Sequence, residues 1–148
     1  MTNKELYREF CKKNNQLPIF MMDWWLDAVC AGKGWDVMLC VKRGDEEMRL
    51  LGDEEMRLLG DEEIVAAMPY LLRKRAWMQY ILMPQQTQIG GIWMSEDITE
   101  DAEKVTAVCQ QFAHKLGEMG LSYYYQHYPI GSPAPQAMKT LGFKVKER

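Results

Sequence analysis

A long apolar stripe constrains the fold of this 148-residue chain more than any other feature of its sequence. Its members recur every three or four residues and so share one face of a helix: Val105, Val108, Cys109, Phe112, Leu116 and Met119. Asp97 and Glu100 have the spacing of a capping box before this helix, and Gly120 stands where it should end. An apolar segment (77–83) precedes the helix and a tyrosine-rich segment (121–128) follows it. The region predicts strand, helix and strand.

Shorter signals extend this pattern to one domain of class α/β (α+β) covering residues 1–148. Thr2 and Glu5 form a capping box at the first helix, and Gly142 ends the last one. Arg73, Lys74 and Arg75 are expected to form a solvated basic turn. The predicted helices are 2–13, 22–30 and 136–141, and the predicted strands are 35–41, 64–72, 77–83, 121–128 and 143–146.

Composition excludes some classes of protein. Hydrophobic residues make up 47% of the chain, which suits a packed domain. No apolar run approaches the ~20 residues needed to span a bilayer. The first sixteen residues are polar and charged, unlike a secretory signal. The cysteines are scattered and read as reduced core residues, with two disulfides as the alternative, so a cytoplasmic location is expected: Cys11, Cys30, Cys40 and Cys109.

Charge is unevenly distributed along the chain. Residues 44–63 hold nine acids and two arginines, a local charge of −7, so the remainder carries about +4. Basic residues are not interleaved with aromatic residues in a block, so the sequence gives no DNA-binding signal.

The acidic segment is an internal repeat. GDEEMRLL occupies 44–51, recurs at 52–59, and begins again as GDEE at 60–63. Without the two full copies (about 44–59), a strand ending at Arg43 meets the strand from Ile64 through a Gly-Asp turn, so the insertion lies in a hairpin. Its composition favours helix, with two added short strands as the alternative. We interpret it as a solvated expansion, the other interpretation being an acidic docking arm.

Several segments, in this order of elements, resemble a known family: PIFMMDWWLDAV (18–29), GWDVMLCV (34–41), IVAAMPYLLRKR (64–75) and MPQQTQIGGIWM (83–94). They are similar to the N-terminal lobe of Fem-type (peptidoglycan-bridge aminoacyltransferase-like) GNAT proteins of Bacteroidetes. The resemblance implies a GNAT-like (acyl-CoA N-acyltransferase) fold, with a mostly antiparallel central sheet flanked by helices. It also implies transfer of an acyl or aminoacyl group to an amine. The Fem donor is aminoacyl-tRNA and the acceptor a peptidoglycan precursor, whereas simple GNAT enzymes use acetyl-CoA.

The start of the long helix departs from the GNAT pattern. GNAT enzymes cradle the pyrophosphate of acetyl-CoA on a glycine-rich loop at this helix end, where free N–H groups and the helix dipole attract anions. Here residues 95–103 contain no glycine and five acids, which would repel a pyrophosphate. We therefore expect no acetyl-CoA binding at this loop and no cofactor.

Candidate site residues come from two segments. His127 ends the tyrosine-rich strand and is the best titratable candidate, with a surface role as the alternative, whereas His114 reads as a boundary residue of the long helix. A polar loop and one tyrosine are the candidate substrate-binding residues: Gln85, Gln86, Thr87, Gln88 and Tyr125. Trp24, Trp25 and Trp35 read as core residues. No cluster has metal-ligand spacing, so no metal is expected.

Two functions follow from these observations. In the first, the chain is a GNAT/Fem-like acyl- or aminoacyltransferase lobe that is catalytically incomplete alone and needs a second GNAT-like lobe or a homodimer partner. In the second, it is a non-catalytic binding or structural domain that keeps the GNAT fold. Aminoacyl-tRNA enters as a partner by the family resemblance only.

Overall fold

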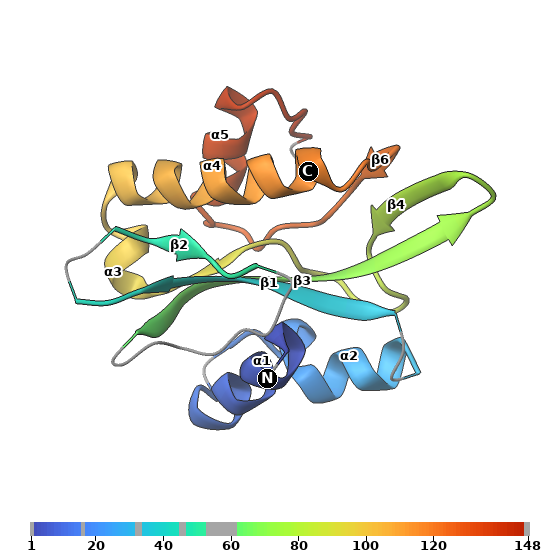
Figure 1. The fold of residues 1–148 in the computed structure, drawn as a ribbon, viewed down its shortest axis with the longest axis horizontal. Coiled ribbons are helices and arrows are strands. Elements are labelled where there is room, and N and C mark those ends of the chain that lie inside the picture. The colour runs from blue at the N-terminus through green and yellow to red at the C-terminus, as the bar shows by residue number, and fades with distance from the viewer. Residues whose placement is uncertain (1, 16, 32–33, 45–46, 53–61, 147–148) are drawn as a thin grey trace.

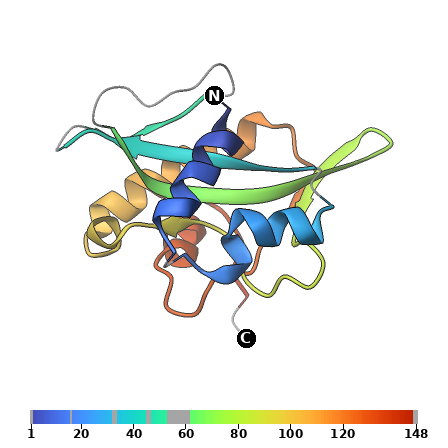
Figure 2. The same cartoon turned by 90° about the horizontal axis from the view of Figure 1, so that it is seen from below.

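A curved sheet separates two layers of helices in the computed structural model, which describes residues 2–15, 17–31, 34–44, 47–52 and 62–146 (Figure 1). One face is covered by α1 (Asn3–Lys13), the 3-10 turn η1 (Ile19–Met21) and α2 (Asp23–Val29) (Figure 2). The other face carries α4 (Ala102–Glu118) and α5 (Ala134–Thr140), with the short α3 (Glu96–Thr99) at one end. This arrangement confirms the mixed α/β (α+β) class. Among the described residues, no helix is long and apolar enough to cross a membrane.

The N-terminal layer forms as predicted. The Thr2 hydroxyl accepts from the Glu5 N–H and the Glu5 carboxylate accepts from the Thr2 N–H, completing the capping box of α1. Arg8 of α1 joins Asp27 of α2 through two N–O contacts of 2.7 and 2.8 Å. Trp35 donates from its indole N–H to the same carboxylate. These bonds lower the pKa of Asp27, the Arg8 guanidinium being the main cause.

The sheet has the strand order β2-β1-β3-β4-β6, and only the β4–β6 pairing is parallel among the described strands. The bounds are β1 (Trp35–Lys42), β2 (Arg49–Leu50), β3 (Glu63–Arg75), β4 (Met78–Leu82), β5 (Trp93–Met94) and β6 (Tyr123–Tyr124). Val41 pairs with Ile64 across β1 and β3, which confirms the hairpin predicted around the insertion. The predicted basic turn at 73–75 is wrong. Arg73 and Arg75 belong to β3, because they pair with Tyr80 and Met78.

The insertion contributes a strand where a helix was favoured. Arg49 and Leu50 form β2, which pairs with Val41 and Cys40 of β1. Leu51 is only 2% exposed, so burial of an apolar side chain overrides the helix propensity of the repeat. The Gln111 side chain of α4 also donates to the Met48 carbonyl at 2.8 Å. The first copy of the repeat thus contacts the rest of the fold through the buried Leu51 side chain and through the Met48 carbonyl. Residues 53–61, with most of the second copy, lie outside the described residues.

The long helix begins later than predicted. Asp101 is its N-cap and accepts from the N–H groups of Glu103 and Lys104, while residues 96–99 form the separate helix α3. The predicted capping box of Asp97 and Glu100 is therefore wrong. Gly120 does follow the helix end, with φ of 66°.

The C-terminal third contains less strand than predicted. Within 121–128 only Tyr123 and Tyr124 are strand, and residues 143–146 form none. The last helix, α5, begins at Ala134 and is followed by Gly142 with φ of 101°.

Two apolar clusters fill the layers on either side of the sheet. Phe112, Val108 and Cys109 of α4 pack against Ile81 and Met68 on one face. The other cluster lies between the sheet and the helices α1 and α2. Its members include Leu6, Tyr7, Leu26, Trp35, Val37, Leu39, Val41 and Leu51. All four cysteines are free thiols, as predicted. Of the three tryptophans expected in the core, Trp35 is 2% exposed but Trp24 is 52% exposed.

The repeat supplies a test of its own docking. Leu51→Ala removes a buried side chain and should lower the free energy of unfolding by about 2–5 kcal/mol. Chemical denaturation followed by circular dichroism measures this loss. Ile130→Ala removes an exposed apolar side chain and is the control. Equal losses in the two variants would contradict the burial of Leu51.

Candidate functional site

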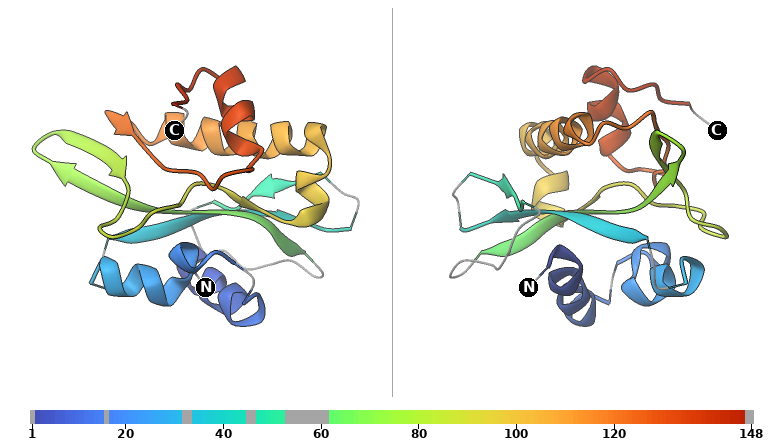
Figure 3. Two further views of the ribbon diagram at one scale, coloured as in Figure 1. Left: turned by 180° about the vertical axis from the view of Figure 1, so that it is seen from behind. Right: turned by 45° about the vertical axis from the view of Figure 1, so that its right-hand side comes forward.

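The candidate site lies where a loop leaves the central strand. Along one edge of β3, β5 pairs with Ala66 and Ala67, and β4 pairs with 71–75. Residues 68–70 are not paired with either strand on that edge. The connecting residues 83–92 instead run past the segment that follows β6 (Figure 3). Pro69 stands in the middle of this interruption and has no N–H to offer a neighbouring strand.

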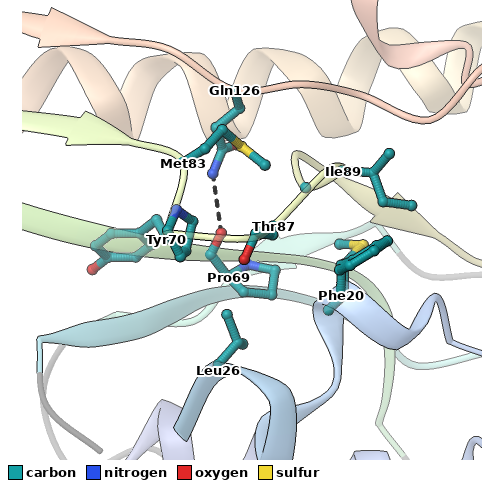
Figure 4. A pocket seen from close by; sticks show the side chains of 11 residues that line it. Phe20, Leu26, Pro69, Tyr70, Met83, Thr87, Ile89 and Gln126 are labelled. Atoms are coloured by element: carbon teal, nitrogen blue, oxygen red, sulfur yellow. Dashed lines mark hydrogen bonds between the residues drawn. The ribbon is translucent and has the colours of Figure 1, made fainter. Parts of the chain in front are cut away.

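Gln126 occupies the interruption, and it was not among the residues predicted from sequence. Its side-chain N–H donates to the Pro69 carbonyl at 3.1 Å (Figure 4). Its side-chain oxygen accepts from the Tyr124 hydroxyl at 2.8 Å. Because Tyr124 has one hydroxyl proton, the 2.9 Å contact between Tyr124 and Tyr128 has Tyr128 as the donor. Burial raises the pKa of both tyrosines, so both hydroxyls are neutral. The network is satisfied and uncharged.

A small hollow opens beside this network. Its cavity volume is about 10 Å³, roughly the space that one water molecule needs. Figure 4 shows mostly apolar side chains around it, including Phe20, Leu26, Pro69 and Ile89, with Thr87 and Gln126 as polar members. Pockets that bury drug-sized ligands typically measure about 300–1,000 Å³. The hollow is therefore far too small to hold a substrate.

Only one residue of the predicted polar loop lines this hollow. Thr87 does so, and its hydroxyl accepts from the Trp25 indole N–H at 3.0 Å and donates to the Gln85 carbonyl at 3.1 Å. These bonds fasten the loop to α2. Gln85, Gln86 and Gln88 are exposed, and Gln86 adopts φ of 59° in the turn. The structure thus gives Thr87 a positioning role and leaves the three glutamine side chains at the surface.

The two remaining candidates form a pair outside the hollow. Tyr125 Oη and His127 Nε2 are 2.7 Å apart, and their rings meet edge to face with centroids 4.9 Å apart. The backbone places His127, because its carbonyl accepts from the Gly90 N–H at 2.6 Å. Within the described part of the chain, no carboxylate is bonded to His127. The pair lacks the third group that orients a catalytic base in a triad. His114 instead lies 2.8 Å from Glu118 on α4.

Gly91 allows the loop to approach the tyrosine network. A Cβ atom at this position would lie 2.6 Å from the Tyr128 ring, and the glycine has φ of 85°. Both the short contact and the positive φ disfavour any residue with a Cβ atom at position 91. This close approach is what holds residues 83–92 against the segment that follows β6.

Charge at the start of α4 opposes anion binding. The Asp101 carboxylate lies 3.0 Å from the Glu103 N–H and 3.4 Å from the Lys104 N–H. Glu96, Asp97, Glu100 and Glu103 stand nearby in sequence and are exposed. Lys42 approaches this group, with its Nζ 3.9 Å from the Asp97 carboxylate. The N–H groups that would bind a phosphate are therefore already occupied by a negative side chain.

The thiols and metal ligands offer no alternative chemistry in the described part of the chain. Burial raises the pKa of Cys40 to about 12 and that of Cys11 and Cys109 to about 11, so these thiols are protonated and unreactive at neutral pH. No group of three or more His, Cys, Asp or Glu side chains among the described residues could hold a metal ion.

Gly91 provides a test of the packing at the site. Gly91→Ala should lower the free energy of unfolding by about 2–5 kcal/mol, because a positive φ costs about 1–2 kcal/mol and the clash with Tyr128 adds about 1–3 kcal/mol. Gly131→Ala is the matched control, since Gly131 has φ of 87° but nothing within 4 Å of its Cβ position. Denaturant unfolding measures both variants. A loss for Gly91→Ala no larger than that for Gly131→Ala would contradict the contact.

Comparisons with known proteins complete the description of the site. No family model, no curated protein sequence and no solved structure matches this chain.

Proposed function

We propose that this chain is a non-catalytic binding domain with an acyltransferase-like (GNAT-like) fold, similar to one lobe of a Fem-type transferase. It would bind a partner or an acceptor without holding an activated acyl donor. The observation that carries this proposal is the Asp101 carboxylate, which accepts from the N–H groups at the start of α4. The proposed fold and the proposed absence of a donor site rest on separate contacts.

The path of the chain around α4 supports the GNAT-like fold. β4 and β6 are parallel, lie side by side and are connected through α4. The two strands pair at Tyr80 with Tyr123 and at Ile81 with Tyr124. After these pairs they separate into different loops. In GNAT proteins, substrates enter where the parallel strands diverge. Here that position holds Gln126 and the small hollow.

The polar groups at this position are engaged with one another. Thr87 is bonded to Trp25 and Gln85, and Gln126 is bonded to Pro69 and Tyr124. A general base needs a side chain within reach of the proton that it abstracts, and a nucleophile needs an adjacent base. The satisfied side chains offer neither, so the arrangement favours binding over catalysis.

A second function is favoured by a separate surface. Ile19 of η1 is 51% exposed and Trp24 of α2 is 52% exposed. Trp24 contacts Trp25, which contacts Phe20, both edge to face. Exposed apolar patches mark interfaces in soluble proteins. A second lobe or a second copy packed here could complete a transferase, with aminoacyl-tRNA as the donor implied by the family resemblance.

Calorimetric titration with acetyl-CoA tests the absence of a donor site. We expect no measurable heat of binding, because the acids at the start of α4 repel the pyrophosphate. Amide NMR spectra should likewise show no shift at Glu103 and Lys104. Asp101→Ala is the matched variant, and we expect it to lose about 1 kcal/mol of stability as a helix cap without gaining affinity. Micromolar binding to the unmodified chain would overturn the proposal.

Sedimentation velocity tests the second function. A homodimer that buries Trp24 should form at micromolar concentration and should be lost in Trp24→Ala. The control variant is Trp77→Ala, which removes an exposed tryptophan from another surface. A monomer at these concentrations would contradict a homodimer as the completed transferase.

A further inference from the structure

The end of the β3–β4 hairpin, which we call the hairpin tip, comprises residues 73–78. It projects beyond both helical layers and is seen in profile in Figures 1 and 2 and in the left panel of Figure 3. The pairing of Arg75 with Met78 leaves a two-residue turn at Ala76 and Trp77. Trp77 is 87% exposed, and Ala76 adopts φ of 55°, which is costly for a residue with a Cβ. The tight turn thus presents a large aromatic side chain to solvent.

The charges at the hairpin tip form no salt bridge within the part of the chain that the structure describes. Arg73, Lys74 and Arg75 are exposed, and no carboxylate of the described residues forms a salt bridge with them. The sequence contains no acidic residue between 64 and 95. Three positive charges therefore lie within four residues of Trp77, in a part of the sequence that contains no negative charge.

Aromatic side chains continue along the hairpin from this tip. Arg73 pairs with Tyr80, which pairs with Tyr123 on β6, so these side chains share one face of the sheet. Tyr123 is 54% exposed. This face is opposite to that of Leu72, Ile81 and Tyr124, which pack toward α4. The hairpin tip and the face behind it therefore combine cations with exposed aromatic rings.

We propose that the hairpin tip docks on the surface of an anionic lipid bilayer, with Trp77 in the headgroup region and Arg73, Lys74 and Arg75 on the lipid phosphates. Tryptophan and tyrosine concentrate at membrane interfaces because their rings have an apolar body and a polar edge. Basic residues near a negatively charged leaflet gain favourable energy that falls off within a Debye length. The tip supplies both contributions at one projecting point.

The shape of the tip favours a bilayer over other anionic partners. Single-stranded nucleic acid needs a groove that tracks its backbone, with rings on which successive bases stack. Trp77 instead projects from a turn, where a single aromatic side chain can insert into the headgroup region of a bilayer. A protein interface needs a packed apolar centre, whereas only Ala76 and Met78 adjoin Trp77 in the chain and three cations precede them. The predicted association is peripheral, since the hairpin tip is too short to span a bilayer.

Vesicle co-sedimentation tests this inference with the full chain. We expect binding to phosphatidylcholine vesicles containing phosphatidylserine and no binding to phosphatidylcholine alone. Neutralising each of Arg73, Lys74 and Arg75 with glutamine should weaken partitioning about fivefold, and raising the salt concentration should weaken it further. Trp77→Ala should reduce binding and should abolish quenching of tryptophan fluorescence by brominated lipids. Thermal unfolding should be unchanged, because these side chains are exposed.

Matched variants separate the tip from general charge and hydrophobicity. Lys144→Gln removes an exposed cation from the C-terminal segment, and Ile130→Ala removes an exposed apolar side chain from the segment between β6 and α5. Both should bind the vesicles as the unmodified chain does. The proposal is overturned if anionic vesicles are not bound or if the control variants lose as much binding as the tip variants. It is also overturned if a single-stranded oligonucleotide, but not the vesicles, is bound in a Trp77-dependent way.

Discussion

The backbone of β3 must find hydrogen-bond partners along both edges, and this requirement shapes the candidate site. β1 follows one edge from Lys42 to Trp35, whereas the other edge is divided between β4 and β5. Buried backbone groups that lack partners are costly. Pro69 lowers the requirement in the interruption because it has no N–H, and Gln126 supplies a donor to its carbonyl. The loop at 83–92 can therefore leave the sheet without an orphaned carbonyl at Pro69.

The same requirement also explains why the polar residues of the site hold the fold together and are not arranged as a catalytic group. Gln126 is held by Tyr124, and Tyr124 is held by Tyr128, whose ring lies against Gly91. Each link depends on the next, and burial keeps both hydroxyls neutral. A network of this kind fixes one arrangement of two loops. It leaves His127 and Tyr125 at the surface, where they contact each other.

Local signals in the sequence predicted much of the fold and little of the site. The capping box of Thr2, the hairpin around the insertion and the apolar face of α4 depend on neighbours in sequence, and these predictions are confirmed. The helix favoured for the insertion was wrong over the described part of its first copy, because Leu51 is buried by tertiary packing. Gln126 was missed because its partner Pro69 is 57 residues away. A proline within a predicted central strand was the one available signal that this strand is interrupted.

Charge divides the molecule along the direction of β3. The strand begins at Glu63, beside the acidic insertion, and ends at Arg75 in the hairpin tip, roughly 40 Å away at ~3.3 Å per residue. The acids at α3 and the start of α4 lie toward the end of the fold where β3 begins (Figures 1 and 3). An anionic surface would attract one end and repel the other, so it would orient the molecule as well as bind it. Both proposals follow from this asymmetry: the acidic end disfavours a phosphate donor at α4, and the basic end favours lipid phosphates at Trp77.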